Sequence, residues 1–443
     1  MLDAKFVREN PEVVRAAMQA RGSSWSVDEF LNLDEQRRAI IPKVEGLQAR
    51  RNTASKRIGA LMKEAKREEA EAAKAEVAGI KDEIAALDKQ RADIDNQVNN
   101  LLITAPNLPD ESVPVGQSED DNVELKRWGT PRDFAAEGFE PQAHWDLGPA
   151  LGIIDFERAV KLAESRFVML AGAGAALNRA LITFMLGQHL DAGYKEWWVP
   201  VLANEDALFG VGQLPKFEDD LYKTKTEGDA NAVDGGVTAG KLYLTPTAEA
   251  TLTNIHSKEL LEASQLPLYY TAYTACFREE AGSAGRDTRG MIRVHQFDKV
   301  EMVKLTRPED SFAELEKMTL QAEKILELLE LPYRRIELCT GDLGFCAAKT
   351  YDLEVWLPSY NDYKEISSCS NTLDFQARRA TLKYRDPENF KGSRFIHSLN
   401  GSGLAVGRCF AAIIENNQNK DGSVSIPKAL RPYLRGLKTI TSE

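Results

Sequence analysis

The sequence predicts an α+β protein in which a long antiparallel pair of helices precedes a mixed domain. Two observations support this prediction. Apolar residues recur every seven positions in two successive runs between residues 31 and 102. From about Asp146 onward, helix-like and strand-like runs alternate irregularly, which is typical of α+β domains. Residues 106–145 lie between these parts in a stretch rich in proline, serine and acidic residues, so we expect a linker there.

The two helices are predicted from heptads, in which apolar residues at a and d positions form one seam along each helix. The residues that recur every seven positions are Leu33, Ile40, Leu47, Ala54 and Leu61 in the first run, with Val44 and Ile58 between them, and Ile80, Leu87, Ile94 and Leu101 in the second, with Val77, Ile84 and Val98 between them. Residues 63–73 between the runs are almost wholly charged residues and alanine, where the chain can reverse. We expect two helices of roughly 35 residues, about 50 Å long, that bury each other's seams. A dimerising coiled coil is the alternative.

Charge is distributed unevenly along this hairpin. The whole chain carries a net charge of −12, which argues against indiscriminate binding to nucleic acid. Residues 31–67, however, hold ten lysine and arginine residues against four acidic ones, whereas residues 68–102 hold four against nine. The basic first helix favours an arm that reaches a partner over a simple dimerisation element.

Composition excludes several classes of protein. No apolar run reaches the roughly 18 residues that a membrane span needs, and the amino terminus lacks a secretory apolar core, so we expect a cytoplasmic protein. The five cysteines contain no CxxC pair and the five histidines no HxxxH spacing, so no zinc site is expected. A metal here is expected to be Mg²⁺ held by carboxylate and phosphate oxygens.

The segment from Phe277 to Glu301 is the most informative part of the chain. Two apolar, extended runs are joined by a loop that holds three glycines and two arginines. These are Gly282, Gly285, Gly290, Arg286 and Arg289. Glycines let the backbone approach a ligand closely, and arginines supply planar charged forks, so the segment suits a polyphosphate.

Two shorter segments carry carboxylates beside hydroxyls. In LTPTAEA, Thr247 and Glu249 are two residues apart and would share a face in an extended chain, which suits a small ligand with an ammonium group. In KEISSCSN, the same alternation would put Glu365 and Ser367 on one face, where a carboxylate beside a hydroxyl suits a metal-bound phosphate. Each pattern alone is common in ordinary strands.

A glycine-dense segment, LNGSGLAVGRCFAAIIEN at 399–416, is predicted to be a turn that runs into an apolar helix. Arg408 would fall in the first turn of that helix, where free backbone N–H groups favour anions. The arginine would add a mobile positive charge beside them.

Together these segments resemble the class II aminoacyl-tRNA synthetases, and among them the bacterial type of seryl-tRNA synthetase. The resemblance covers nearly the whole chain and rests on FREEAGSAGRDTRGMIRVHQF, SSCSN and LNGSGLAVGR. It implies a tRNA-binding domain at 1–105 with its hairpin at about 31–102, and a catalytic domain at 146–443 with an antiparallel sheet flanked by helices. Within that domain it identifies motif 1 at 171–200, motif 2 at 272–301 and motif 3 at 399–416, and it implies a homodimer formed through motif 1.

The resemblance also implies an activity. Such an enzyme activates L-serine with ATP to seryl-adenylate, releasing pyrophosphate, and then transfers serine to the 3′ end of tRNA(Ser), and of tRNA(Sec) where that tRNA exists. The expected catalytic residues are Arg278, Glu365 and Arg408. ATP and Mg²⁺ are the expected cofactors, with Glu365 and Ser368 on the Mg²⁺ side.

The binding residues follow from the same match, position by position. The implied ATP site comprises Arg278, Glu279, Glu280, Val294, Phe297, Glu365, Ile366, Ser367, Ser368 and Arg408. The implied serine site comprises Thr247, Ala248, Glu249, Arg278, Glu301 and Ser402. Backbone contacts with tRNA are expected from Arg37, Arg38, Lys43, Arg50, Arg51, Lys56 and Arg57.

Two other functions fit parts of the sequence. An amino-acid ligase that acts on a carrier protein would share the catalytic motifs but would lack the long hairpin. A catalytically inactive RNA-binding relative would have lost Arg278, Glu365 or Arg408, and all three are present. The glycine-rich insertion at 224–241 is longer than the resemblance predicts, and we assign it no role.

Overall fold

The chain forms two compact units, Met1–Pro106 and Asn107–Glu443, in a computed structural model that describes residues 1–224, 241–280 and 289–442. The described residues exclude 225–240, which make up most of the insertion, and 281–288, which include Gly282, Gly285 and Arg286 of the predicted phosphate loop. The boundary expected after residue 105 lies at Pro106.

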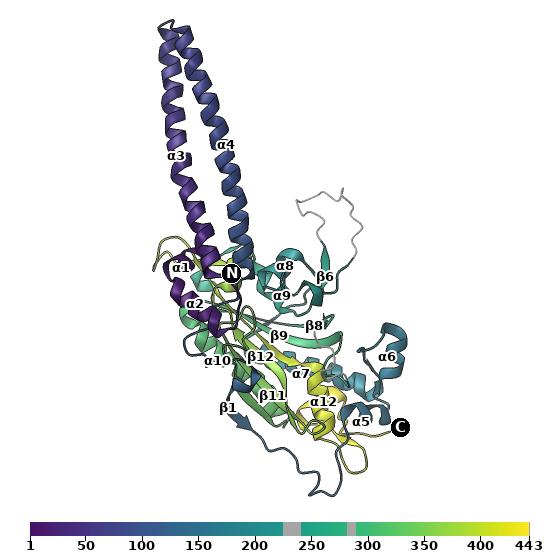
Figure 1. Ribbon diagram of the computed structural model, residues 1–443. Coiled ribbons are helices and arrows are strands. Elements are labelled where there is room, and N and C mark those ends of the chain that lie inside the picture. The colour runs from purple at the N-terminus through teal and green to yellow at the C-terminus, as the bar shows by residue number, and fades with distance from the viewer. Residues whose placement is uncertain (225–240, 281–288, 443) are drawn as a thin grey trace. The chain divides into compact units, whose positions relative to one another are not determined.

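The first unit contains the predicted antiparallel hairpin (Figure 1). Two short helices, α1 (Ala4–Glu9) and α2 (Pro11–Ala20), precede the long helices α3 (Val27–Lys63) and α4 (Arg67–Thr104). Ser26 caps α3 by accepting a hydrogen bond from the Glu29 backbone N–H at 3.1 Å. The chain reverses over residues 64–66, where Ala65 adopts a positive φ of 57°. The two helices therefore pair within one chain, as the heptads predicted.

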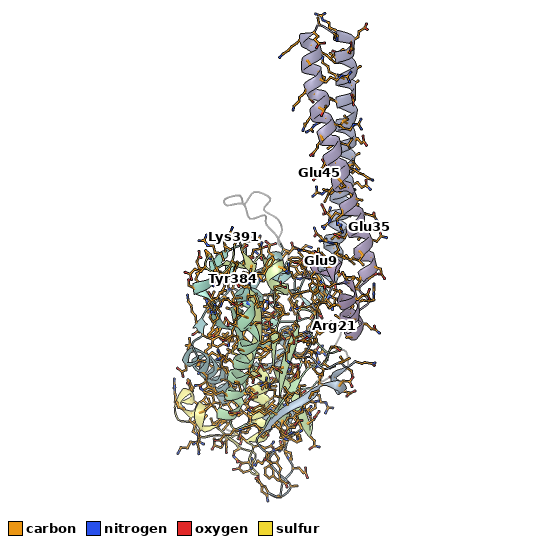
Figure 2. The ribbon with its side chains drawn as sticks, turned by 90° about the vertical axis from the view of Figure 1, so that its left-hand side faces the viewer. Glu9, Arg21, Glu35, Glu45, Tyr384 and Lys391 are labelled. Atoms are coloured by element: carbon orange, nitrogen blue, oxygen red, sulfur yellow. The ribbon has the colours of Figure 1, made fainter. Side chains whose placement is uncertain are left out.

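The seam of the hairpin is buried as the heptads require. Its buried members are Ile40, Val44, Leu47, Ala54 and Leu61 on α3 and Ile80, Ile84, Ile94 and Val98 on α4. Polar side chains such as Glu35 and Glu45 lie on the outer faces of α3 (Figure 2). One departure is Asp34, which is only 1% exposed because Arg8 and Arg37 neutralise its carboxylate at 3.2 and 2.8 Å.

The second unit is built on an eight-stranded sheet with the order β1-β10-β11-β12-β15-β9-β8-β4. In that order the strands are β1 (Val123–Trp128), β10 (Tyr333–Glu337), β11 (Lys349–Leu357), β12 (Asp362–Asn371), β15 (His397–Ala405), β9 (Gln296–Thr306), β8 (Leu268–Phe277) and β4 (Lys195–Glu196). Neighbouring strands are antiparallel except β4 and β8, which pair in parallel. The predicted antiparallel sheet flanked by helices is confirmed, and the two-residue strand β4 makes it mixed at one edge.

Three helices, α7 (Gly172–Asp191), α10 (Ser311–Leu328) and α12 (Val406–Asn416), pack on the sheet (Figure 1). They share one core with it, to which Leu181, Met318 and Phe410 contribute fully buried side chains. The segment identified as motif 1, residues 171–200, contains α7 and β4. Within the described residues no helix has the length and apolar character that crossing a membrane requires.

Smaller elements surround this layer. The short helices are α5 (His144–Ala150), α6 (Phe156–Ala163), α8 (Glu205–Gly210), α9 (Glu249–Thr253) and α11 (Phe375–Ala380). The short strands are β2 (Ile154–Asp155), β3 (Met169–Leu170), β5 (Leu202–Asn204), β6 (Leu242–Leu244), β7 (Leu260–Glu262), β13 (Lys383–Arg385), β14 (Arg394–Phe395), β16 (Val424–Ser425) and β17 (Thr439–Ile440).

Two segments differ from their predicted structure. Residues 106–145 were expected to be a linker, but from Asn107 onward they belong to the second unit, and 123–128 form the edge strand β1, paired with β10. The glycine-dense segment at 399–405 was expected to be a turn, but it is the end of strand β15. A Cβ at Gly401 would lie 2.8 Å from the Cys369 sulfur, and one at Gly403 would collide with His189 of α7. These glycines therefore permit close packing.

Candidate active site

One cleft in the sheet collects most of the side chains singled out from distant parts of the sequence. It encloses an empty volume of about 570 Å³, part of it open to solvent. The predicted residues that line it are Arg278, Glu280, Val294, Phe297, Glu365, Ile366, Ser402 and Arg408. They come from the ends of β8 and β9, from β12 and β15, and from the start of α12. Segments separated by more than a hundred residues thus meet in one cavity.

Arg278 and Phe297 lie together at one side of the cleft. Arg278 directly follows β8, and its backbone N–H donates to the His295 carbonyl at 2.9 Å, which ties the two ends of motif 2 together. Its guanidinium carbon lies 5.2 Å from the centroid of the Phe297 ring. A cation over one face of an aromatic ring leaves the rest of that ring as a surface on which a base can stack.

Arg408 lies in the first turn of α12, as predicted. Its Nη1 donates to the Glu365 carbonyl at 2.5 Å and lies 3.6 Å from the Glu365 carboxylate. Among the described residues no side chain caps the amino end of α12, whose N-cap is Ala405. Ala405 and Gly407 line the cleft. Unpaired N–H groups and a guanidinium at one helix end form a site for an anion.

The register of β12 corrects one prediction about its faces. Glu365 pairs with Glu354, but Ser367 pairs with Leu353, so Ile366 is an extra residue in a β-bulge. The bulge reverses the alternation, and Glu365 shares a face with Ser368 rather than with Ser367. Ser367 is buried and donates its hydroxyl to the Ser402 carbonyl at 2.6 Å, so its side chain joins β12 to β15 instead of lining the cleft.

A second carboxyl group lies opposite Ser368 on β11. Asp352 pairs with Ser368 in register and accepts a hydrogen bond from it. Burial, and secondly the charge of Glu365, raise the pKa of Asp352 well above its usual range. Its Oδ1 has no hydrogen-bond partner among the described residues. Glu365, Ser368 and this oxygen together offer the oxygen ligands that Mg²⁺ prefers.

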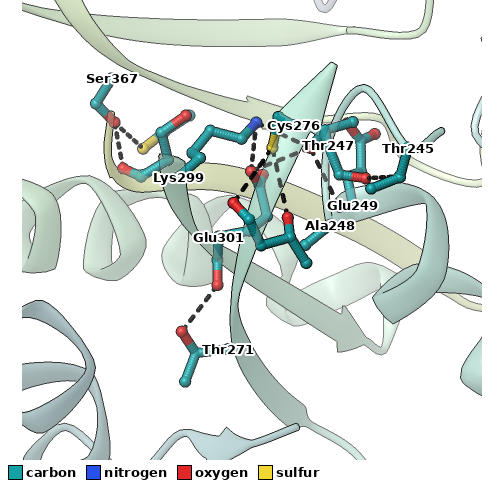
Figure 3. Close-up of polar contacts among 12 residues, drawn as sticks. Thr245, Thr247, Ala248, Glu249, Thr271, Cys276, Lys299, Glu301 and Ser367 are labelled. Carbon is teal, nitrogen blue, oxygen red and sulfur yellow. Dashed lines mark hydrogen bonds and ion pairs between the residues drawn. The ribbon is translucent and has the colours of Figure 1, made fainter. Parts of the chain in front are cut away.

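Of the predicted serine-binding residues, Arg278 and Ser402 line the cleft, whereas Thr247, Glu249 and Glu301 belong to a buried polar cluster (Figure 3). Thr247 donates to Glu301 Oε2 at 3.2 Å, and both residues are almost completely buried. Lys299, which the sequence analysis did not single out, bridges them, with its Nζ 2.5 Å from Glu301 Oε2 and 2.8 Å from Thr247 Oγ1. A lysine ammonium therefore occupies the centre of the cluster.

Glu249 lies beside this cluster, but not for the predicted reason. It begins helix α9, and Ala248 is the N-cap, so Thr247 and Glu249 do not share the face of an extended strand. They meet through a turn, in which the Glu249 N–H donates to Thr247 Oγ1 at 3.2 Å. Burial, and secondly the nearby charge of Glu301, raise the pKa of Glu249 to about 7, although Gln376 donates to its carboxylate at 2.7 Å.

Of the remaining predicted residues, Glu280 lines the cleft, whereas Glu279 and Ala248 do not. Glu279 is exposed and lies outside the set of described residues that line the cleft, and Ala248 is fully buried. Glu280 lines the cleft and accepts a hydrogen bond from Arg293, a further lining residue that was not predicted, at 3.2 Å.

A larger polar hollow with an empty volume of about 1560 Å³ lies beside the cleft. The two share Ile292, Arg293, Glu365 and Arg408 in their walls. Arg408 thus contributes to the walls of both cavities.

The predicted tRNA-contacting residues all lie on α3 in the first unit. Arg38, Lys43, Arg50, Lys56 and Arg57 are exposed, and Arg51 is half-buried. Arg37 is also half-buried, with its guanidinium 2.8 Å from the Asp34 carboxylate, and Arg50 lies 3.6 Å from Glu76.

Comparison with known proteins agrees with this arrangement. Residues 1–109 match the model of the seryl-tRNA synthetase N-terminal domain, and residues 237–417 match that of the class II tRNA synthetase core domain for G, H, P, S and T. The chain is 54% identical over 442 residues to a serine–tRNA ligase of Desulforamulus reducens, with all of both chains covered. It is 52% identical over 435 residues to that of Carboxydothermus hydrogenoformans, with 98% of each covered.

Two solved structures resemble the whole chain. The seryl-tRNA synthetase of Pyrococcus horikoshii complexed with ATP has a TM-score of 0.91 and 37% identity, covering 100% of both chains. The cytoplasmic serine–tRNA ligase of Naegleria fowleri in complex with AMP has a TM-score of 0.88 and 29% identity, covering 100% of this chain and 99% of the other.

Proposed function

This chain belongs to the seryl-tRNA synthetase family, and on that premise we propose that it is a serine–tRNA ligase. It activates L-serine with ATP and then transfers the seryl group to the 3′ end of tRNA(Ser). The observation that carries the proposal is the convergence of Arg278, Glu365 and Arg408 on one cleft that adjoins the Thr247–Glu301 cluster. An anion-binding cavity beside buried ammonium acceptors suits a nucleoside triphosphate and an amino acid side by side.

In the first step, an oxygen of the serine carboxylate attacks the α-phosphorus of ATP, and the bond to the pyrophosphate oxygen breaks. A carboxylate is already a nucleophile, so the protein has to position the reactants and neutralise phosphate charge. Arg278 is the fork that holds the α-phosphate and the serine carboxylate together. Arg408 and the amino end of α12 hold the γ-phosphate, which keeps ATP bent and directs pyrophosphate toward the larger polar hollow.

Adenine recognition falls to the Phe297 side of the cleft. The base stacks on the ring of Phe297, and Glu280 and the backbone near Val294 meet its edges. Glu279, although exposed, directly follows Arg278 and contributes to the same end of the site.

Mg²⁺ fits the residues present. Within the described ranges no group of three or more histidine, cysteine and acidic side chains is arranged to hold a metal alone. Mg²⁺ commonly binds through one or two carboxylates together with substrate phosphates, so a site completed by ATP suits it. Glu365 and Ser368 would hold the ion, with Asp352 behind them. The ion, when bound, would neutralise charge on the phosphates.

Serine recognition relies on acceptors. Glu249, Glu301 and Thr247 receive the ammonium and the hydroxyl, and Ser402 reaches the hydroxyl from β15. A site built to hydrogen-bond a hydroxyl discriminates strongly against an analogue without one, because its own polar groups are then left unpaired. Alanine should therefore be a poor substrate.

In the second step the terminal ribose hydroxyl of tRNA attacks the carbonyl carbon of the adenylate, and AMP leaves. The exposed cations of α3 contact the tRNA backbone, which positions the tRNA without reading its sequence. We extend the proposal to tRNA(Sec) in cells that contain it. Aminoacylation of purified tRNA(Sec) with radioactive serine would test that extension, which fails if tRNA(Ser) alone is charged.

A homodimer in the cytoplasm is also proposed. The segment after β4 exposes a large apolar surface: Trp198 is 92% exposed, and Val201 and Leu202 are each 40% exposed. Such apolar side chains close together on a surface favour a partner subunit. Analytical ultracentrifugation of the Trp198→Glu variant should give a monomer, and an unchanged dimer would place the interface elsewhere.

The enzymatic proposal is tested by serine-dependent exchange of radioactive pyrophosphate into ATP, measured across all twenty amino acids. We expect exchange with serine far above that with the other nineteen. If exchange were highest with a different amino acid, that amino acid and not serine would be the substrate. An absence of exchange with all of them would leave a binding role. Aminoacylation of a carrier protein in place of tRNA would support the carrier-protein ligase.

A further inference from the structure

Lys299 occupies the position in which the proposed function puts the ammonium of serine. Its Nζ lies 2.5 Å from Glu301 Oε2 and 2.8 Å from Thr247 Oγ1 (Figure 3). These two oxygens are among the acceptors expected to recognise the amino acid. The side chain of Lys299 is 9% exposed and that of Glu301 is 1% exposed, so water contributes little to solvating either charge.

The hydrogen-bonding capacity of Thr247 makes the two ammonium groups mutually exclusive. A threonine hydroxyl donates one hydrogen bond and accepts two. Thr247 donates to Glu301, and it accepts from Lys299 and from the Glu249 N–H. Its capacity is therefore complete before any ligand arrives. A second ammonium on the same oxygens would also stand next to the first, and like charges repel strongly in a buried site.

The position of Lys299 on strand β9 offers its side chain a second environment, at the nucleotide end of the site. Residues two apart on a strand share a face, so Phe297, Lys299 and Glu301 form one row. Lys299 is the middle member, about 7 Å along the strand from each of the others. It also lines the cleft and pairs in register with Ala405, the residue at the start of α12. The lysine thus stands between the amino-acid end and the nucleotide end of the site.

We propose that Lys299 is a coupling residue, whose ammonium stands in for that of serine in the free protein and is displaced toward the nucleotide when serine binds. The proposal rests on the serine–tRNA ligase function. Serine brings one ammonium and one carboxylate, and its ammonium takes over the contacts with Glu301 and Thr247. The released positive charge then faces the point where the serine carboxylate and the α-phosphate meet. Binding of serine therefore strengthens binding of ATP, and by linkage ATP strengthens binding of serine to the same degree.

The test measures this coupling by calorimetry on the full chain with an ATP analogue whose α,β-bridge is a methylene group. For the wild type we expect serine and the analogue each to tighten the other's binding at least tenfold. With 3-hydroxypropanoate, which has the carboxylate and hydroxyl of serine but no ammonium, the mutual effect should be less than twofold. In Lys299→Met, serine alone should bind at least tenfold more tightly than to the wild type, and its coupling to the analogue should fall below twofold.

Different outcomes would contradict the role of Lys299 and the proposed serine–tRNA ligase function. Lys299→Met with the wild-type coupling between serine and the analogue would overturn the role of Lys299. Equal coupling for serine and 3-hydroxypropanoate in the wild type would do the same. A wild type that binds no serine, with or without the analogue, would instead contradict the proposed function.

A crystal structure of the wild type with serine bound keeps the proposal testable if Lys299→Met does not fold. The serine ammonium should lie within 3.2 Å of Glu301 and Thr247, with Lys299 Nζ moved away from both. A lysine that still contacts both residues would refute the displacement.

Discussion

The two ends of the active site differ in how their charges are satisfied before any substrate arrives. At the nucleotide end, Arg408 donates to backbone carbonyls and lies 3.6 Å from the exposed carboxylate of Glu365, and the amino end of α12 has no side-chain cap among the described residues. At the amino-acid end, Lys299, Glu301 and Thr247 are buried and already paired. A triphosphate can thus bind an arginine whose one carboxylate contact within the described residues is long and exposed to solvent. Serine, in contrast, has to replace an internal partner.

This difference teaches that two kinds of specificity are combined. The open end accepts an anion by charge and shape, and it discriminates weakly among anions of the same geometry. The closed end recognises only a ligand that restores each hydrogen bond it breaks, which excludes molecules without the correct ammonium and hydroxyl.

The largest effect should come from Arg278, the residue that serves both ends. We expect Arg278→Ala to lower kcat/KM in pyrophosphate exchange about 1000-fold, or about 4 kcal/mol, because both the α-phosphate and the serine carboxylate lose their fork. KM for ATP and for serine should both rise. If KM rose for only one of the two substrates, Arg278 would bind that substrate alone.

Arg408→Ala should affect the nucleotide end alone. We expect kcat/KM for ATP to fall by about 10- to 100-fold, whereas KM for serine stays within about twofold of the wild type. Steady-state exchange with each substrate varied in turn measures both constants. Lys391→Ala, which removes an exposed cation that does not line the cleft (Figure 2), is the matched control. Unchanged ATP kinetics would remove the γ-phosphate role.

Glu249 allows the amino-acid end to be tested by pH. Its pKa is raised to about 7 by burial and by Glu301, and the ionised carboxylate is the form that binds an ammonium. KM for serine should therefore fall as pH rises through about 7, and Glu249→Gln should remove this step while raising KM about tenfold.

The same shift has a consequence for stability. Since the folded state holds the Glu249 proton more tightly than the unfolded chain, this residue makes the free energy of unfolding decrease as pH rises from about 4.5 to about 7. A Glu249→Gln variant whose serine KM keeps the wild-type pH profile would assign that titration to another group.

The sequence predicted the hairpin and most of the cleft because both depend on local patterns. Heptads determine which residues of α3 and α4 are buried, and the glycine-dense segment before Arg408 is recognisable in the sequence, although it forms a strand and not the predicted turn. The bulge at Ile366 could not be predicted, because it depends on the pairing of β12 with β11, and it decides which serine shares a face with Glu365. Lys299 was missed because a lysine is usually exposed, and its burial follows from β9 lying inside the sheet.

Strand β1 was missed for a related reason. Its sequence, VELKRW, is polar and follows an acidic, proline-containing stretch, so it is typical of a loop. As an edge strand it has one neighbour, β10, and needs few apolar side chains. Strand β1 is stabilised by its pairing with β10, which lies more than two hundred residues away in the sequence.

The smallest effect separates the two serines of β12. Ser367→Ala removes a buried hydrogen bond to the Ser402 carbonyl and should lower the free energy of unfolding by about 1 kcal/mol, with the Mg²⁺ dependence of exchange unchanged. Ser368→Ala should raise the Mg²⁺ concentration needed for half-maximal exchange severalfold and leave stability almost unchanged. Urea unfolding and Mg²⁺ titration measure the two quantities. If Ser367→Ala changed the Mg²⁺ dependence and Ser368→Ala lowered the stability, Ser367 would share a face with Glu365, which would contradict the bulge.

A crystal structure of the protein with a non-hydrolysable seryl-adenylate analogue tests the central claim most directly. We expect one ligand in the cleft, with its phosphate on Arg278, its base against Phe297 and its ammonium on Glu301 and Thr247. An analogue bound elsewhere, or bound in the cleft with its ammonium away from both Glu301 and Thr247, would contradict it.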